Sequence, residues 1–294
     1  MTRPEHRTLE EAVLSDYLPY SPEVLSIQPL SGGCINEAVK VDTSEGSFFL
    51  KWNQPDHLDQ FRKEAAGLGL LSQTGCITVP NVLKAGSLHH SAYLLLEYIS
   101  PEPPHPSFWE DFGRRMAQLH QHSSPNAQYG LEVNNYIGRL AQQNNWNPSW
   151  IEFFITHRLE VQLSLAYGQG LVTSELMARF RRLYNQLPNL LPEAPPSLIH
   201  GDLWSGNFLC GPGGRAALID PAVYYGHREI ELAFTRLFGG FTSTFYDSYQ
   251  EAWPLDPGFE QRVELYNLYP LLVHINLFGQ SYLSGITEVV KKYT

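Results

Sequence analysis

Two runs of residues, Leu198-Ile-His-Gly-Asp-Leu-Trp-Ser-Gly-Asn-Phe-Leu209 and Ala217-Leu-Ile-Asp-Pro221, decide how the rest of the chain is interpreted. Short apolar stretches within them flank the polar side chains of Asp202, Asn207 and Asp220. Apolar stretches of this length between turn residues are typical of buried strands. We therefore expect strands to hold the backbone while three oxygen-bearing side chains converge.

The segment between these runs predicts the turn of a hairpin. Gly211-Pro-Gly-Gly214 is rich in the residues that form tight turns. Folding the chain back at this turn brings Asn207 opposite the strand that ends at Asp220, so an amide oxygen and a carboxylate lie side by side. Mg²⁺ prefers a few protein oxygens of this kind together with a phosphate. Asn207 and Asp220 are therefore predicted metal ligands.

The spacing of Asp202 and Asn207 indicates phosphoryl transfer. Asp202 lies five residues before Asn207, which is the interval between base and metal-binding Asn in the kinase loop H-R-D-x-x-x-x-N, although Gly201 replaces the Arg. Such a reaction needs a carboxylate that accepts the hydroxyl proton and a metal that holds the phosphate oxygens. Asp202 is the predicted base. The alternative is a hairpin in which Asp and Asn residues only cap turns.

This region resembles a known family. The resemblance is carried by His200-Gly-Asp-Leu-Trp-Ser-Gly-Asn207, Ile219-Asp-Pro-Ala222 and Tyr225-Gly-His-Arg-Glu-Ile-Glu-Leu-Ala233, which are similar to the fructosamine kinase (ketosamine-3-kinase) family. That family belongs to the protein-kinase-like group that includes aminoglycoside and choline kinases. The resemblance implies an α+β, bilobal protein-kinase-like fold with a five-stranded antiparallel sheet plus helix and a mostly α C-terminal lobe. It also implies ATP as the phosphoryl donor and the 3-hydroxyl of a ketosamine as the acceptor.

The composition excludes several classes of protein. The chain has 294 residues, 43% of them hydrophobic, and a net charge of −10. This charge argues against nucleic-acid and anionic-membrane surfaces, because both attract basic patches. The three cysteines, at positions 34, 76 and 210, form no metal or disulfide framework, and the N-terminus has no apolar core of the signal-peptide type. We expect a cytoplasmic protein acting on a small-molecule or protein substrate.

The first hundred residues predict a nucleotide-binding lobe, and residues 101–294 a catalytic and substrate-binding lobe. The break is the proline-dense segment Ser100-Pro-Glu-Pro-Pro-His-Pro106. The first turn between strands carries Gly32 and Gly33, where a kinase-like chain covers nucleotide phosphates, although taken alone this pair is better explained by a plain hairpin turn. The expected elements are a helix over 9–18, strands over 24–30, 36–42, 47–52, 79–85 and 92–99, and a helix over 56–74.

Lys51 and Glu64 predict an ion pair that serves the nucleotide. Lys51 interrupts an apolar strand, and Glu64 lies on the helix face that carries Phe61 and Leu68. An acid on a buried face requires a cation, and Lys51 on the preceding strand is the candidate. Kinases use this strand Lys and helix Glu to position the α- and β-phosphates. The alternative is a solvated edge Lys and a surface Glu.

The strand that ends at residue 99 leads into the predicted hinge. In kinase-like folds this strand offers its backbone to adenine, so the resemblance points to the main-chain groups of Glu97 and Ile99. An ordinary buried strand is compatible with that role, because only backbone atoms bind.

The second lobe is expected to be mostly helical. Predicted helices cover 150–167, 174–187, 227–238, 242–252, 257–276 and 280–292, with another beginning after a capping box at Ser107 and burying Phe108 and Phe112. Trp204 follows the base and offers an aromatic face to the sugar or its amine, unless it is only a core residue. His200 is expected to fasten the loop by hydrogen bonds. Arg228 and Glu231 are expected to brace it through ion pairs.

Cys34 directly follows Gly33 on the predicted nucleotide loop. Burial statistics favour an inert thiol. The family resemblance adds an alternative, because some ketosamine kinases carry a matching Cys that supports a redox-switched disulfide dimer. A monomer and a redox-linked homodimer both stay open.

The sequence therefore predicts a ketosamine kinase that uses ATP and Mg²⁺. One alternative is a related small-molecule kinase acting on an aminoglycoside, choline or homoserine. Another is a catalytically silent nucleotide-binding scaffold, against which the joint presence of Lys51, Glu64, Asp202, Asn207 and Asp220 argues.

Overall fold

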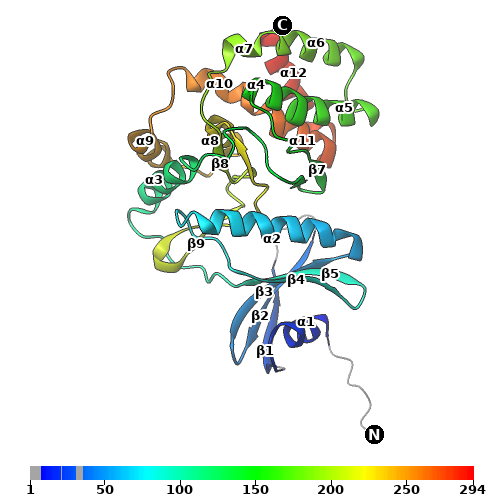
Figure 1. Cartoon of the computed structure of the whole chain (residues 1–294), viewed down its shortest axis with the longest axis vertical. Helices are drawn as coiled ribbons and strands as arrows, with labels where there is room; N and C mark the ends of the chain where they lie inside the picture. The colour runs from blue at the N-terminus through cyan, green and yellow to red at the C-terminus, as the bar shows by residue number, and fades with distance from the viewer. Residues whose placement is uncertain (1–7, 21, 31–35) are drawn as a thin grey trace. The chain divides into compact units, whose positions relative to one another are not determined.

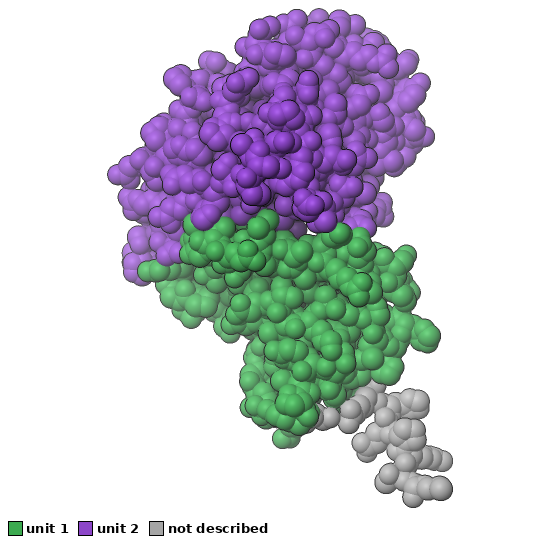
Figure 2. All heavy atoms as spheres, in the orientation of Figure 1, with its two compact units in different colours: residues 1–104, 209–219 green, residues 105–208, 220–294 purple. Residues whose placement is uncertain are grey.

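A computed structural model describes residues 8–20, 22–30 and 36–294, and the statements below concern these residues. Contacts divide the chain into two compact units, coloured separately in Figure 2. Unit 1 comprises residues 1–104 and 209–219, and unit 2 comprises residues 105–208 and 220–294. The first break thus falls within the proline-dense segment that the sequence predicts as a hinge.

Unit 1 is built on an antiparallel sheet whose five described strands have the order β1-β2-β3-β5-β4 (Figure 1). Side chains alternate across β3, so Phe48 and Leu50 face one side and Lys51 the other. Phe48 and Leu50 pack with Val13 and Leu14 of helix α1, and α2 covers the opposite face. The elements are α1 (Leu9–Tyr17), β1 (Val24–Pro29), β2 (Glu37–Thr43), β3 (Gly46–Asn53), β4 (Val82–Leu88), β5 (Ser91–Glu97), the 3₁₀ turn η1 (Pro55–His57) and α2 (Leu58–Gln73).

The turn between β4 and β5 is tighter than the sequence predicts. Strand β4 runs through the predicted loop to Leu88, which leaves His89 and His90 as the connection. Both have positive φ angles, 48° and 66°. Two successive residues of this conformation match the right-handed twist of a hairpin, so pairing of the strands outweighs the cost to two non-glycine residues.

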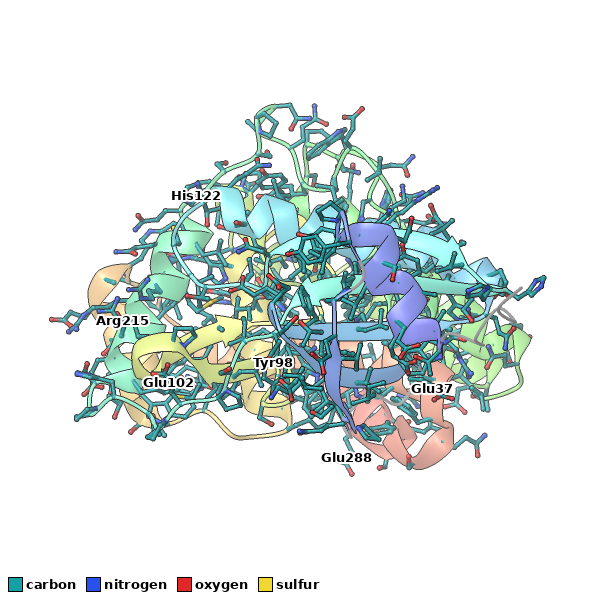
Figure 3. All side chains as sticks on the ribbon, turned by 90° about the horizontal axis from the view of Figure 1, so that it is seen from below. Glu37, Tyr98, Glu102, His122, Arg215 and Glu288 are labelled. Atoms are coloured by element: carbon teal, nitrogen blue, oxygen red, sulfur yellow. The ribbon has the colours of Figure 1, made fainter. Side chains whose placement is uncertain are left out.

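The hairpin that follows the Asp202 loop belongs to unit 1. It consists of β9 (Phe208–Gly211), the 3₁₀ turn η3 (Pro212–Gly214) and β10 (Arg215–Leu218). The N–H of Leu218 donates to the carbonyl of Thr78 and that of Glu102 to the carbonyl of Cys210, each at 2.9 Å. Figure 3 labels Glu102 near this hairpin. Dividing the sequence at residue 100 assigns the hairpin to the second lobe, whereas these long-range hydrogen bonds attach it to the first.

Unit 2 is mostly helical, as predicted. Phe108 and Phe112 on α3 are buried, and α3 lies so close to α9 that a Cβ at Gly113 would be 2.2 Å from the carbonyl oxygen of Phe245. The helices are α3 (Phe108–His120), α4 (Trp150–Phe153), the π-helix η2 (Phe154–Leu159), α5 (Glu160–Gly168), α6 (Ser174–Tyr184), α7 (Leu187–Leu190), α8 (Arg228–Leu237), α9 (Ser243–Ala252), α10 (Phe259–Tyr266), α11 (Leu268–Phe278), the 3₁₀ turn η4 (Gln280–Tyr282) and α12 (Leu283–Lys292).

Two short antiparallel pairs complete unit 2: β6 (Asn135–Ile137) with β7 (Leu140–Gln142), and β8 (Ser197–Ile199) with β11 (Tyr224–Gly226). Along the described chain, no helix is both long and apolar enough to cross a bilayer.

Three local predictions in unit 2 need correction. Ser107 makes no capping hydrogen bond to α3, because its hydroxyl contacts the ring of His105 instead. The helix predicted over 257–276 is divided at Asn267, whose side chain donates to the carbonyl of Ala233. The helix predicted over 150–167 contains a π-helical turn that carries the buried Arg158. The Ser107 contact is local, whereas the division at Asn267 involves a residue 34 positions away, which sequence periodicity does not report.

Candidate active site

The loop that carries Asp202 starts from a short strand pair. Ile199 of β8 is paired with Tyr224 of β11, and the N–H of Ala222 donates to the carbonyl of His200 at 2.9 Å. Asp202 lies two residues beyond His200, and Asp220 lies two residues before Ala222. The pairing therefore brings both carboxylates to the same end of the two strands.

Gly201 is required by the close approach of these two chain segments. Its φ of +83° lies in the left-handed region, and a Cβ would be 2.1 Å from the carbonyl oxygen of Ala222. Only glycine combines this conformation with this distance. This explains why the chain carries Gly201 where the kinase pattern H-R-D has Arg.

Asn207 holds Asp202 through its amide nitrogen. Nδ2 donates to the backbone carbonyl of Asp202 at 2.8 Å and to its Oδ2 at 3.0 Å. Asn207 itself is buried, with 6% of its surface exposed. Because the nitrogen is used on the Asp202 side, Oδ1 is the amide atom that can serve as a metal ligand.

Asp202 and Asp220 interact electrostatically. Burial is the main factor that raises the pKa of Asp202 well above its usual value, and the negative charge of Asp220 raises it further. The hydrogen bond from Asn207 acts in the opposite direction. Asp202 keeps partial access to solvent, and Asp220 is exposed with a left-handed φ of 53°. Two neighbouring carboxylates favour a bound cation, which would reduce their repulsion.

The available donors fit Mg²⁺ better than a transition metal. Across the described ranges, no group of three His, Cys, Asp or Glu side chains could hold a metal ion. Asn207 and Asp220 supply amide and carboxylate oxygens, which suit Mg²⁺ when phosphate and water complete its coordination.

Glu231 braces the loop from α8, as predicted, but it does so through hydrogen bonds from backbone N–H groups of the loop and not through an ion pair with it. Its carboxylate accepts the N–H of Gly201 at 2.7 Å and the N–H of His200 at 3.1 Å, and it contacts Nε2 of His120 at 2.8 Å. Burial alone would raise the pKa of Glu231, but the hydrogen bond and charge of His120 lower it overall. An ionised acceptor therefore fixes the backbone immediately before Asp202.

The prediction for His200 is confirmed, whereas the prediction for Arg228 is wrong. Nδ1 of His200 accepts the N–H of Asp202 at 3.3 Å, which is the fastening role that the sequence predicts. Arg228 does not brace the loop, because its guanidinium donates to the carbonyls of Trp253 and Pro254 and lies 3.7 Å from the centre of the Trp253 ring. It ties α8 to the segment after α9 instead.

In unit 1, the predicted ion pair is present. Nζ of Lys51 lies 2.7 Å from Oε2 of Glu64, and both side chains are mostly buried. At the end of β5, the N–H of Glu97 donates to the carbonyl of Asn81. Ile99 is buried, and within the described ranges its N–H has no backbone partner. The remaining nucleotide-loop residues of the prediction, Gly32, Gly33 and Cys34, lie outside the described residues.

Trp204 packs on its own loop and points toward α8. The indole lies so close to Gly206 that a Cβ there would be 2.4 Å from the ring. Its edge meets the ring of Phe238, with 6.4 Å between centroids. Trp204 is half-buried.

A cavity in unit 2 adjoins Asp202, and sequence reasoning missed most of its wall. Residues from α8 and α11 contribute to it at positions more than twenty residues from the loop, where only an apolar helical pattern is visible in the sequence. The cavity is lined by Ile137, Ile199, Gly201, Asp202, Tyr224, Ile230, Glu231, Phe234, Tyr269, Pro270, Val273 and His274.

Comparisons with known proteins show the family to which the chain belongs. A family model described as fructosamine kinase matches residues 8–294. The chloroplastic protein-ribulosamine 3-kinase of Oryza sativa subsp. indica is 38% identical over 274 residues, covering 92% of this chain and 79% of that protein. The crystal structure of a candidate fructosamine-3-kinase from Haemophilus somnus superposes with a TM-score of 0.85 at 31% identity, covering 97% and 96% of the two chains.

A structure with lower sequence identity has a similar fold. An aminoglycoside phosphotransferase has a TM-score of 0.64 at 17% identity, covering 97% of this chain and 98% of its own. The predicted α+β, protein-kinase-like fold is therefore confirmed. The family model spans residues 8–294, and the protein-ribulosamine 3-kinase is 38% identical over 92% of the chain, so the chain belongs to the fructosamine kinase family.

Proposed function

We propose that this protein is a kinase that transfers a phosphoryl group from ATP, with Mg²⁺, to the 3-hydroxyl of a ketosamine, either free or attached to a protein. The observation that supports this most strongly is the grouping of Asp202, Asn207 and Asp220, in which Asn207 holds the Asp202 carboxylate and Asp220 lies within electrostatic range. Membership of the fructosamine kinase family supports the choice of acceptor.

Asp202 is the proposed base. Its carboxylate accepts the proton of the attacking hydroxyl, while the bond from Nδ2 of Asn207 holds one of its oxygens in place. Glu231 keeps the preceding backbone fixed. Oδ1 of Asn207 and the carboxylate of Asp220 would hold Mg²⁺, which when bound neutralises the charge on the β- and γ-phosphate oxygens.

The residues proposed for ATP lie in unit 1. Lys51, held by Glu64, supplies a positive charge for the α- and β-phosphates. The main-chain groups at Glu97 and Ile99 are proposed for adenine, with the N–H of Ile99 as a donor. Gly32 and Gly33 remain proposed for the phosphate loop.

A coupled ATP assay tests the function. Ribulose-amine, fructose-amine, an aminoglycoside, choline and homoserine are compared as acceptors for the wild type. We expect turnover with a ketosamine. Turnover of an aminoglycoside or choline without either ketosamine would contradict the acceptor, and no turnover with any acceptor, despite ATP binding, would favour a silent scaffold.

The compartment and assembly also stay proposals. The acidic composition and three scattered cysteines support a cytoplasmic protein. For Cys34, non-reducing gels of the wild type and Cys34→Ser after peroxide treatment decide between a monomer and a redox-linked homodimer. A thiol-reversible dimer band only in the wild type supports the dimer, and identical lanes contradict it.

A further inference from the structure

The cavity beside Asp202 contains a histidine that the proposed chemistry does not use. His274 of α11 and Asp202 both line this cavity, together with Tyr224, Phe234 and Tyr269. All five residues belong to unit 2. A group bound against Asp202 therefore shares its cavity with the imidazole of His274.

The hydrogen bond of His274 determines what its ring can offer a ligand. Nδ1 lies 2.7 Å from the carbonyl oxygen of Pro270. A carbonyl can only accept, so Nδ1 carries the hydrogen and Nε2 of the neutral ring is an acceptor. Burial lowers the pKa of His274, which favours this neutral form, although the Pro270 bond opposes the shift. Nε2 has no hydrogen-bond partner in the described part of the chain.

Aromatic rings surround His274. The centroids of Phe238, Tyr282 and Phe278 lie 4.8, 5.0 and 5.5 Å from that of the imidazole. Phe238 is 40% exposed and Phe278 is 53% exposed. On its other side, Phe238 meets the edge of Trp204 from the Asp202 loop. These contacts form a partly exposed aromatic surface that runs from the loop to the end of α11.

The charges of the cavity favour a cationic ligand. The charged side chains that line it are acidic, namely Asp202 and Glu231. Exposed aromatic rings next to an acidic cavity suit an amine that carries a carbon substituent, because ring faces attract cations. A ketosamine has this chemistry: its amine is on C1, two carbons from the hydroxyl on C3.

We propose that His274 determines acceptor specificity: Nε2 accepts a hydrogen bond from the protonated amine of the ketosamine, and the rings of Phe238 and Phe278 contact the substituent beyond that amine. This inference rests on the proposed function. It makes the amine, and not only the sugar, part of what the enzyme recognises.

The test separates recognition of the amine from recognition of the sugar. Wild type, His274→Leu and His274→Gln are assayed with fructose-amine and with 1-deoxyfructose, which keeps the C3 hydroxyl but lacks the amine. We expect His274→Leu to raise KM for fructose-amine about 10- to 100-fold, the loss of a hydrogen bond to a charged group. KM for ATP and the kinetics with 1-deoxyfructose should stay within about twofold, and His274→Gln, which retains an acceptor, should recover part of the loss.

Phe278→Ala tests the aromatic surface. It should raise KM for a ketosamine with a large substituent, such as a fructosyl-lysine peptide, more than KM for fructosyl-methylamine. Tyr167→Ala is the matched control, because Tyr167 is also about half exposed, at 49%, but lies on α5. It should change neither value.

The possible outcomes distinguish failure of the proposed role of His274 from failure of the proposed kinase function. A wild type that phosphorylates ketosamines, with His274→Leu unchanged or impaired equally on both sugars, overturns the role of His274 alone. A wild type inactive on every ketosamine overturns the proposed function and this inference together. If His274→Leu fails to fold, His274→Gln and Phe278→Ala still test the proposal. Equal effects of His274→Gln on fructose-amine and 1-deoxyfructose, or of Phe278→Ala on ketosamines with large and small substituents, would contradict it.

Discussion

The ammonium of Lys51 on β3 lies 2.7 Å from the carboxylate of Glu64 on α2, and little of either side chain reaches solvent. The pair joins the sheet of unit 1 to the helix that covers it. Its charges are taken out of water and depend on each other, because a buried charge without a partner is costly.

We therefore expect Lys51→Met and Glu64→Gln each to destabilise the protein, Lys51→Met by about 3 kcal/mol because it removes the cation beside a buried carboxylate. The double variant should lose less than the sum of the single variants. Urea denaturation of all four proteins measures this coupling. Additive losses would show that the two charges do not depend on each other, and an unchanged KM for ATP in Lys51→Met would contradict its role in phosphate binding.

Gly201 and Gly213 provide a matched pair of substitutions. Both have positive φ angles, but a Cβ at Gly201 would meet the carbonyl of Ala222 at 2.1 Å, whereas a Cβ at Gly213 has nothing within 4 Å. We expect Gly213→Ala to cost about 1–2 kcal/mol of stability from backbone strain. Gly201→Ala should cost more, by about 1–3 kcal/mol of steric overlap, and should abolish activity because it moves the loop. Equal losses in denaturation experiments would disprove the close approach.

Trp204 tests the acceptor side of the loop. Trp204→Phe keeps an aromatic ring but reduces the surface that a sugar or amine can contact. We expect kcat/KM for the ketosamine to fall about 3- to 10-fold, with KM for ATP unchanged. Steady-state kinetics with each substrate varied separately measure this. A change in KM for ATP alone would contradict a role of Trp204 in binding the acceptor.

Protonation of Asp42 is expected to make the stability of the protein depend on pH. Its pKa is lowered to about 2, first by Lys40 and next by Ser47. Ser26 adds a hydrogen bond at 2.9 Å. In the unfolded chain an aspartate titrates near 4, so the unfolded state binds the proton first as the pH falls. The stabilisation is present above about pH 4 and is lost as the pH falls toward 2.

Asp42→Asn provides the reference for this effect. The difference in unfolding free energy between wild type and Asp42→Asn should be constant near neutral pH and should shrink between about pH 4 and 2. Denaturation series at several pH values measure it. A difference that grows as the pH falls would contradict the assignment.

Much of the fold could be predicted because its signals are local. The Lys51 and Glu64 pair followed from a charge on an apolar strand and another on an apolar helical stripe. The hairpin is predicted by its glycine-rich turn, and the fastening role of His200 by its place in the loop. Glu231 lies about 30 residues later and is predicted only from its position near the start of the helix that follows the site.

Other features depend on contacts between distant segments. His274 reaches the Asp202 cavity from a helix whose sequence reports only apolar periodicity. Arg228 lies next to Glu229 and Glu231, yet the carbonyls of Trp253 and Pro254 decide where it points. The attachment of the hairpin to unit 1 depends on Thr78, which lies about 140 residues earlier in the chain. No local pattern encodes such pairings.

The most direct test of the central claim compares Asp202→Asn with the wild type in two measurements, turnover of a ketosamine and calorimetric binding of Mg·ATP. Asn keeps the size of the side chain but cannot accept the hydroxyl proton, so kcat should fall about 10²- to 10⁴-fold. The dissociation constant of Mg·ATP should stay within about threefold, because Asn207 and Asp220, not Asp202, are the proposed metal ligands. Turnover by Asp202→Asn close to that of the wild type would contradict the account.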